Sequence, residues 1–330
     1  MSGIAERKAR AVLIVLAISW VAVAALGPLI GAHGFGLGEL VEENGTLSTI
    51  LWQIRVPRVL LALLGGGILA ASGLAFQSLF QNPLAEPYTL GVAGGAALGA
   101  VVALQFGGST AGWGLPLVAV AAFLGALAVS AVISGLAVSP MGINTSTLLL
   151  AGIAISLTCS ALILLIQYVS DLTRTFHMVR WMMGGLAVVG YQEVLWLAPW
   201  WLIGGAMLMG LRWELNLLLT GEELAASRGL NLVRLRLTVL TATSLMVGSL
   251  VAVTGPIGFV GLIVPHLLRR LTTEDHLYLL PACLLGGGVF LALCDLVART
   301  VLAPAELPVG VLTALLGGPF FLWLLVAQRR

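Results

Sequence analysis

Arginines that stand beside long apolar stretches are the residues of this chain best suited to bind something. Arg55 and Arg58 precede 27 uncharged residues, and on a helix their three-residue spacing would put both guanidinium groups on one face. Arg299 lies four residues after Asp295 and can pair with it. A guanidinium binds a carboxylate through two hydrogen bonds, so these arginines are either snorkelling membrane anchors or a landing patch for an acidic soluble protein.

Two short polar turns interrupt the apolar stretches. One reads Asn-Pro-Leu at 82–84, and the other reads Asn-Thr-Ser-Thr at 144–147. Thr145 or Ser146 can cap a helix that starts there, because a hydroxyl accepts a hydrogen bond from a free backbone N–H. The turns are therefore simple helix caps, or they meet on a pore axis and close it.

A third polar stretch, residues 213–234, predicts a short helix over 221–228. We expect the Thr220 hydroxyl to cap it, with Glu222 and Glu223 in the first turn, where the helix dipole favours acids. Gly229 fits the position just after a helix end. Such a helix is either a solvated connector or a rigid lever for a soluble partner.

Other chemistry finds little support in the sequence. His266 has Arg269 and Arg270 nearby but no neighbouring carboxylate or cysteine, so we expect a structural role and no metal site. The three cysteines are far apart within apolar runs, as buried small hydrophobes are. No catalytic arrangement and no phosphate-binding GxxxxGK[ST] loop occurs. Charge is absent from the middle of every span, so a path powered by another chain, or a channel, fits best.

Composition indicates which elements position these residues. The chain is 59% apolar and 9% charged, against about 25% charged in soluble domains, which predicts an all-α polytopic membrane protein. The sequence predicts ten apolar spans, the first a retained helix and the eighth broken by glycine and proline: 11–31, 57–80, 89–107, 115–138, 147–169, 194–212, 235–254, 257–271, 277–299 and 307–327.

The distribution of Lys and Arg predicts the orientation. Ten spans put both termini on one side, and a cytoplasmic N-terminus leaves eleven Lys/Arg inside and five outside. Arg55, Arg58 and Arg299 are then outer residues, against the usual bias. Because no long soluble region occurs, residues 1–330 are expected to form one membrane domain, with 213–234 as its largest inner loop.

Several motifs, in order along the chain, resemble those of one family. The chain is similar to the FecCD-type (type II) permease subunits of ABC importers for iron-siderophores, haem and cobalamin. The resemblance rests on these blocks: RVPR (55–58), SGLAFQSLFQNPLAEPYTLGVAGGAALGA (72–100), LLLAGIAIS (148–156), WMMGGL (181–186), GEELAASRGL (221–230), GPIGFVGLIVPHLLRRL (255–271), DLVAR (295–299) and ELPVGVLTALLGGPFF (306–321).

The resemblance implies a type II importer fold, partners and site residues. It implies a permease homodimer (in some members a heterodimer) in the cytoplasmic membrane, with two ATP-binding subunits and a periplasmic or lipoprotein binding protein. ATP and Mg would be bound by the partner ATPase, so no enzyme activity, cofactor or nucleic acid is expected for this chain. It assigns binding-protein docking, ATPase coupling and the cytoplasmic gate to three sets: Arg55, Arg58 and Arg299; Thr220, Gly221, Glu222, Glu223, Ala225 and Gly229; Asn82, Leu84, Thr145 and Ser146.

The sequence leaves the cargo open among ferric siderophore, haem and cobalamin. Residues 172–186 slightly resemble cobalamin permeases, whereas the loop LTTEDH (271–276) departs from the glycine-containing turn common in the family. Two other classes remain as alternatives: a stand-alone secondary carrier or channel for a small solute, and a structural or sensory membrane subunit.

Overall fold

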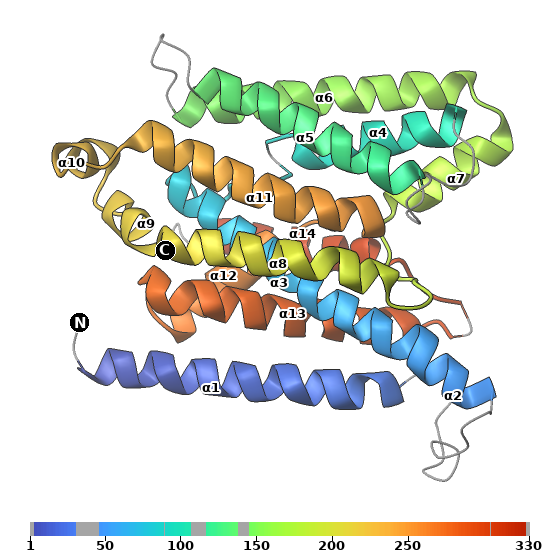
Figure 1. Ribbon diagram of the computed structural model, residues 1–330, viewed down its shortest axis with the longest axis horizontal. Coiled ribbons are helices and arrows are strands. Elements are labelled where there is room, and N and C mark those ends of the chain that lie inside the picture. Colours follow the sequence, from blue (N-terminus) through green and yellow to red (C-terminus); the bar gives the residue numbers. More distant parts are fainter. Residues whose placement is uncertain are drawn as a thin grey trace.

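Every regular element that the computed structural model describes is helical (Figure 1). The described residues are 3–30, 46–88, 90–106, 117–137, 145–303 and 305–327. The longer helices are α1 (Gly3–Leu26), α3 (Val56–Leu79), α4 (Val92–Phe106), α5 (Leu117–Ala137), α6 (Thr145–Val169), α8 (Gln192–Gly210), α11 (Leu232–Thr254), α13 (His276–Thr300) and α14 (Val309–Ala327). The shorter elements are η1 (Gly27–Leu29), α2 (Thr46–Ile50), η2 (Leu51–Arg55), α7 (Leu172–Met182), α9 (Arg212–Leu218), α10 (Glu222–Ser227) and α12 (Val260–Leu271).

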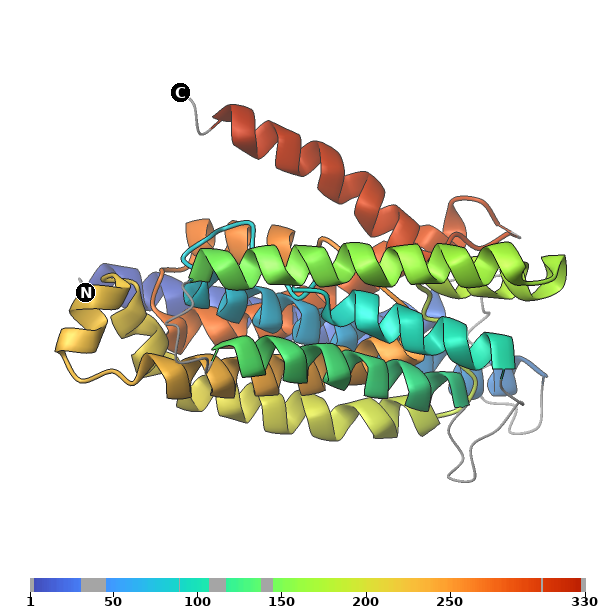
Figure 2. The same cartoon turned by 90° about the horizontal axis from the view of Figure 1, so that it is seen from above.

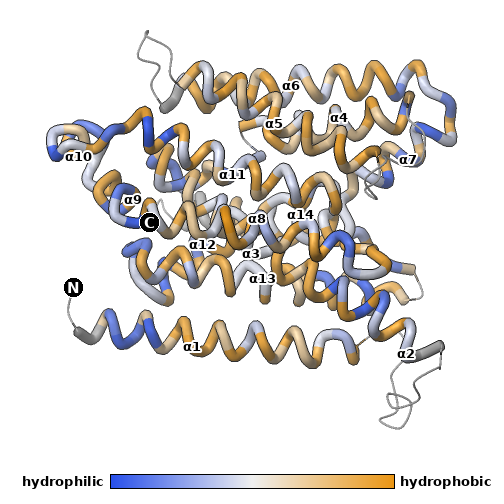
Figure 3. Tube along the Cα trace, viewed as in Figure 1, coloured by the Kyte–Doolittle hydropathy of each residue, from blue (hydrophilic) through white to orange (hydrophobic). Residues whose placement is uncertain are grey.

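Each apolar segment predicted from the sequence falls on a helix. In the described part, seven helices have the length and composition to cross a membrane. Two shorter apolar helices, Val92–Phe106 and Val309–Trp323, join them. Figure 3 shows hydrophilic residues gathered at the two ends of the bundle, with α10 at one end and α7 at the other. This arrangement is that of a multi-pass membrane protein.

Helix α3 is the core of the bundle. In its most apolar window 89% of the residues are buried, whereas the corresponding windows of α1 and α6 are 11% and 17% buried. Helices α8, α11, α12 and α13 pack around it. A buried helix can be apolar on all sides, and the central position of α3 therefore explains why apolar residues cover every face of it.

Glycines allow the close contact between α3 and α13. A Cβ on Gly66 would overlap the backbone carbonyl of Gly287, and a Cβ on Gly287 would overlap that of Gly66. Further along α3, a Cβ on Gly73 would overlap the backbone of Gly261 in α12. Small residues at membrane helix interfaces let backbones approach in this way. Three helices are therefore held together by backbone packing.

Helices α12 and α14 depart from regular spanning geometry. Helix α12 has 12 residues, begins after Phe259 in the left-handed conformation (φ 69°) and contains Pro265, as the broken eighth segment predicted. Figure 2 shows α14 leaving the bundle, with its C-terminal half standing away from the other helices. The side chains of Leu315 and Leu322 on α14 are 65% exposed.

Candidate functional site

A buried ion cluster lies where α3 begins. The Arg58 Nε donates to both carboxylate oxygens of Asp295 at 3.0 Å, and its Nη2 donates to Oδ1 at 2.9 Å. The third nitrogen, Nη1, donates to Glu306 Oε2 at 2.7 Å. Arg58 is 7% and Asp295 1% exposed, whereas the Glu306 side chain is 52% exposed. Only the Glu306 arm of this cluster thus opens to the outside of the protein.

The other two arginines of the predicted landing patch adjoin this cluster. The Arg299 Nη2 donates to the Gly27 carbonyl at 2.9 Å, and its Nε lies 3.8 Å from Asp295 Oδ2. Arg55 is half-buried, and its Nη1 donates to the Pro28 carbonyl at 3.4 Å. The structure thus brings all three arginines to one end of the bundle, with Arg299 and Arg58 held inside it.

Sequence reasoning missed Glu306. Its partner Arg58 lies far away in the sequence, and Glu306 belongs to the connection before α14. The Leu307 backbone N–H donates to the Ala298 carbonyl at 3.0 Å, which brings this connection back against α13. The one available signal was a lone acid beside an apolar segment, and it did not indicate a partner.

At its other end, α3 closes with two capping hydrogen bonds. The Asn82 N–H donates to the Gln77 carbonyl at 3.1 Å, and the Gln81 N–H donates to the Ser78 carbonyl at 3.4 Å. This pattern is a Schellman motif, in which the residue after the helix end is left-handed and usually glycine. Here that residue is Gln81, with φ 46°.

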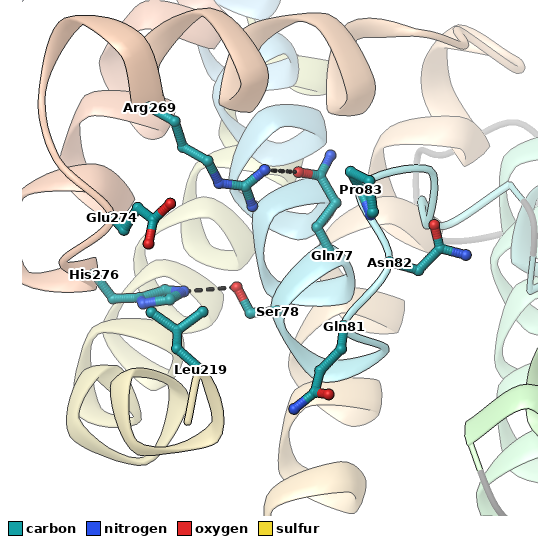
Figure 4. A pocket seen from close by; sticks show the side chains of 9 residues that line it. All are labelled: Gln77, Ser78, Gln81, Asn82, Pro83, Leu219, Arg269, Glu274 and His276. Atoms are coloured by element: carbon teal, nitrogen blue, oxygen red, sulfur yellow. Dashed lines mark hydrogen bonds between the residues drawn. The ribbon is translucent and has the colours of Figure 1, made fainter. Parts of the chain in front are cut away.

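Side chains in the last turns of α3 bind neighbouring helices. The Gln77 Nε2 donates to the Gly261 carbonyl at 2.9 Å, and its Oε1 accepts from Arg269 Nη1 at 2.7 Å, both on α12. The Ser78 Oγ lies 2.7 Å from His276 Nε2 on α13. Figure 4 shows the Gln77–Arg269 and Ser78–His276 contacts. They fix the end of α3 to α12 and α13.

Two cavities flank Gln81. One, of about 310 Å³, is lined by the end of α3, Arg269, Glu274 and His276 (Figure 4). The other, of about 620 Å³, lies between the end of α3 and the start of α10, and Gln81 lines it too. The Gln81 Nε2 donates to the Leu218 carbonyl, at the end of α9, over 2.8 Å.

The predicted gate residues Asn82 and Leu84 lie directly after this point. The Asn82 side-chain oxygen accepts from the Leu84 N–H at 2.9 Å, which makes a tight turn. Glu86 is buried and accepts a hydrogen bond from the Phe259 backbone N–H, just before α12. Burial raises the pKa of Glu86 to about 7, and the hydrogen bond opposes this rise.

The second predicted half of the gate is only partly visible. Helix α6 begins at Thr145, in agreement with the predicted helix start at Thr145 or Ser146. The side chains of Thr145 and Ser146 lie outside the described residues, and so does Asn144. Whether these residues meet Asn82 and Leu84 therefore stays a prediction.

The predicted short helix of the 213–234 loop is α10. Gly229 follows it with φ 89°, and the Leu230 N–H donates to the Ala225 carbonyl at 3.1 Å, so the predicted glycine stop is confirmed. Ala225, within α10, is fully buried. The predicted Thr220 cap is wrong. Gly221, with φ 103°, occupies the cap position, and the Thr220 hydroxyl donates backwards to the Leu217 carbonyl at 2.8 Å.

The two acids of α10 differ in their surroundings. Glu222 accepts from Arg236 Nη2 through both oxygens, at 2.9 and 3.0 Å, which fixes α10 to the start of α11. Glu223 is exposed, and so is Leu224 beside it. Of the two acids, Glu223 is thus the more exposed and Glu222 the one held in a salt bridge.

Histidine and cysteine side chains in the described part of the chain have structural surroundings. Among the described residues, no three His, Cys, Asp or Glu side chains gather as metal ligands would. His266 lies edge-on to Phe320 of α14, with ring centroids 5.9 Å apart. Cys159, Cys283 and Cys294 are free and buried.

Helix α7 is the longest of the helices that sequence reasoning missed, α2, η2 and α9 being the others. It lies in the connection between α6 and α8, where no helix was predicted, and it is amphipathic. Asp171 caps it by accepting from the Arg174 N–H at 2.9 Å. An Asp before a mixed polar and apolar run was the signal that would have found it.

Comparison with known proteins places these features in a family. The model of the FecCD transport family matches residues 8–327. The vitamin B12 import system permease protein BtuC of Salmonella paratyphi A is 43% identical over 307 residues, which cover 91% of this chain and 90% of BtuC. The protein of the same name from Salmonella typhimurium has the same identity and coverage. A solved structure described as an inward-facing conformation of a metal-chelate type ABC transporter superposes with a TM-score of 0.84, at 33% identity, over 96% of this chain and 99% of the other. The chain belongs to the FecCD transport family.

Proposed function

We propose that this chain is the permease subunit of an ATP-driven, binding-protein-dependent importer for an iron chelate or cobalamin. The observation that carries the proposal is the 43% identity to a vitamin B12 permease over 91% of this chain. Among the candidate cargoes, this likeness favours cobalamin. The chain supplies the path across the cytoplasmic membrane, and a separate ATPase that binds ATP and Mg supplies the energy.

The proposed topology has ten spans with both termini in the cytoplasm. The seven long apolar helices, α4, α14 and the short α12 together provide ten membrane segments. Only one orientation places the majority of Lys and Arg inside. It puts α10 on the cytoplasmic side and the ion cluster around Arg58 on the outer side, at opposite ends of α3.

In this proposal α10 is the contact to the ATPase. Glu222 and Gly229 set the position of the helix, Ala225 packs it down, and Glu223 faces the partner. An exposed carboxylate suits a basic residue on the ATPase. The coupling role of the loop is thus supported by an exposed face on a helix that is itself fixed by a salt bridge.

The ion cluster is the proposed docking point for the binding protein. Arg55 is half-buried and the outward nitrogen of Arg58 is engaged by the exposed Glu306, so a carboxylate on the binding protein would replace Glu306 there. Arg299 then supports the cluster from below. Arg55→Glu should weaken docking, and Glu306→Gln should strengthen it, in a binding assay at low salt. Unchanged affinity in both variants contradicts the assignment.

Reconstitution tests the proposal as a whole. The chain is placed in proteoliposomes with and without its ATPase, and uptake of cyanocobalamin, ferric siderophore and haem is followed. We expect uptake only with the ATPase, the binding protein and ATP. Uptake by the chain alone without nucleotide would establish the rival reading of a secondary carrier or channel.

A charge reversal separates the permease from a structural or sensory subunit. Glu223→Arg should abolish assembly with the ATPase, because the new guanidinium would repel the basic residue proposed to bind Glu223. Glu6→Arg, at a side chain 43% exposed near the start of α1, is the matched control and should assemble normally. Normal assembly of both variants would contradict coupling through α10.

A further inference from the structure

We propose that Gln81 is a positioning residue that passes the movement of the coupling segment (residues 218–229) to the gate loop (residues 82–86). The inference rests on the proposed function and adds a residue to it. Gln81 has a left-handed backbone, its side chain bonds the coupling segment, and the gate loop begins at the next residue.

The backbone at Gln81 is the first observation. Only Gln81 and Phe259, among the described non-glycine residues, have a positive φ. Glycine occupies this position of a Schellman motif in most helices, because a Cβ is disfavoured in the left-handed conformation. A glutamine in this conformation strains the backbone, and such strain gathers at functional sites.

The side chain at Gln81 supplies that task. Its Nε2 donates to the Leu218 carbonyl at 2.8 Å. Leu218 ends α9, and α10 begins four residues later. One hydrogen bond thus connects the base of the coupling segment to the residue before Asn82. Elsewhere on α9, the Asn216 side chain bonds Asp275 and His276 at the start of α13.

Fixed points lie on both sides of Gln81, and Gln81 itself borders open space. Gln77 and Ser78 fix the preceding turns of α3 to α12 and α13. Glu86 fixes the far end of the gate loop to the start of α12. Between these fixed points Gln81 lies between two cavities of about 310 and 620 Å³, which leave the coupling segment room to move against α3.

Two substitutions at Gln81 separate the effect of backbone strain from the effect of the side-chain hydrogen bond. Gln81→Gly removes the side chain and relieves the backbone, so the protein should be as stable as the wild type or more so. Gln81→Asn keeps an amide and tolerates the left-handed backbone, but it is one methylene too short to reach Leu218. Both variants should assemble with the ATPase, since Glu223 and α10 are untouched.

The readout is the number of cyanocobalamin molecules delivered per ATP hydrolysed by the full complex in proteoliposomes. We expect this ratio to fall about three- to tenfold in both variants, the factor that one lost hydrogen bond supplies. Thermal stability, assembly and the stimulation of ATP hydrolysis by the binding protein should be retained. Gln192→Asn, an exposed amide at the start of α8, is the matched control and should leave the ratio unchanged.

The outcomes distinguish the two levels of the proposal. A wild-type ratio in Gln81→Gly overturns the role of Gln81 while leaving the permease function intact. A loss of stability or assembly in both variants also overturns it, because the residue would then be structural. A wild-type complex that does not hydrolyse ATP in response to its binding protein defeats the proposed function itself.

Discussion

The Arg58 guanidinium binds two carboxylates that differ in exposure, and this difference gives the two acids different roles. Asp295 is 1% exposed and neutralises Arg58 inside the bundle, whereas Glu306 meets the same guanidinium from the surface. Removing one partner of a buried pair leaves an uncompensated charge, which is far more costly than losing an exposed pair. Asp295 is therefore expected to stabilise the fold, whereas Glu306 can be displaced from Arg58 by another carboxylate at low cost.

This difference yields a stability prediction for Asp295. Asp295→Asn should lower the free energy of unfolding by about 3–5 kcal/mol, because Arg58 and Arg299 lose their shared counter-charge. Thermal unfolding in detergent measures the change. Asp171→Asn is the control: its pair with Arg174 is exposed on both sides, and Asn caps α7 as well as Asp does. Equal losses of stability in the two variants would contradict the buried-pair argument.

At the scale of elements, the glycines of α3 and α13 fix the separation of the two helices. Gly66→Leu should disrupt this contact, since the added side chain would overlap the Gly287 backbone and Leu291. Overpacking of this kind costs about 1–3 kcal/mol or more. The unfolding temperature in detergent measures this loss of stability. A variant that folds and unfolds at the wild-type temperature would contradict the prediction. Gly135→Ala on α5 is the control, because no atom lies within 4 Å of its added Cβ.

The gate loop carries a pH prediction through Glu86. Its pKa in the folded protein is raised to about 7, so the folded protein holds this proton more tightly than the unfolded chain. The stabilising contribution is full below the ordinary glutamate pKa of about 4.3 and is lost as the pH rises through about 7. The unfolding temperature should therefore fall between about pH 5 and about pH 8. Glu86→Gln should flatten this dependence, and an unchanged slope in that variant would count against it.

The helices could be predicted from sequence more fully than the sites. Apolar runs long enough to span a membrane leave little choice of structure, and even the broken α12 was indicated by its glycines and Pro265. Contacts across the fold could not be predicted. Nothing near Arg58 in the sequence indicates Glu306, and nothing near Gln81 indicates Leu218. Thr220 failed for a local reason, because a hydroxyl can bond backwards as well as cap forwards.

For the whole molecule, α3 is one continuous rod between the two proposed partner surfaces. The ion cluster around Arg58 holds the first turn of α3, glycine packing holds its middle, and hydrogen bonds to α12 and α13 hold its last turns. A helix fixed along its length moves as a body with α12 and α13. A movement imposed at α10 is then expected to be taken up after the end of α3, where Gln81 bonds α9 and Glu86 bonds the start of α12.

Helix α14 stands away from its own bundle in Figure 2, and its exposed Leu315 and Leu322 are seven residues apart, on one face. Gly318 of the same helix has no atom within 4 Å of an added Cβ, so this helix also presents a small residue to an open side. Lipid covers apolar surface equally well, but small residues open on a membrane helix favour the close approach of another helix. We therefore expect α14 to line the contact between the two permease subunits.

Cysteine cross-linking tests this arrangement, and the buried native cysteines do not interfere. Leu315→Cys and Leu322→Cys should give covalent dimers with a short bifunctional thiol reagent in native membranes. Ile14→Cys on α1 is the matched control: this residue is 60% exposed, but α1 packs along α13 of its own bundle and does not stand away from it. Dimers formed equally at both helices would indicate random collision. A monomeric complex by mass measurement in detergent would contradict the homodimer, whereas an intact dimer without α14 cross-links would move the contact to another helix.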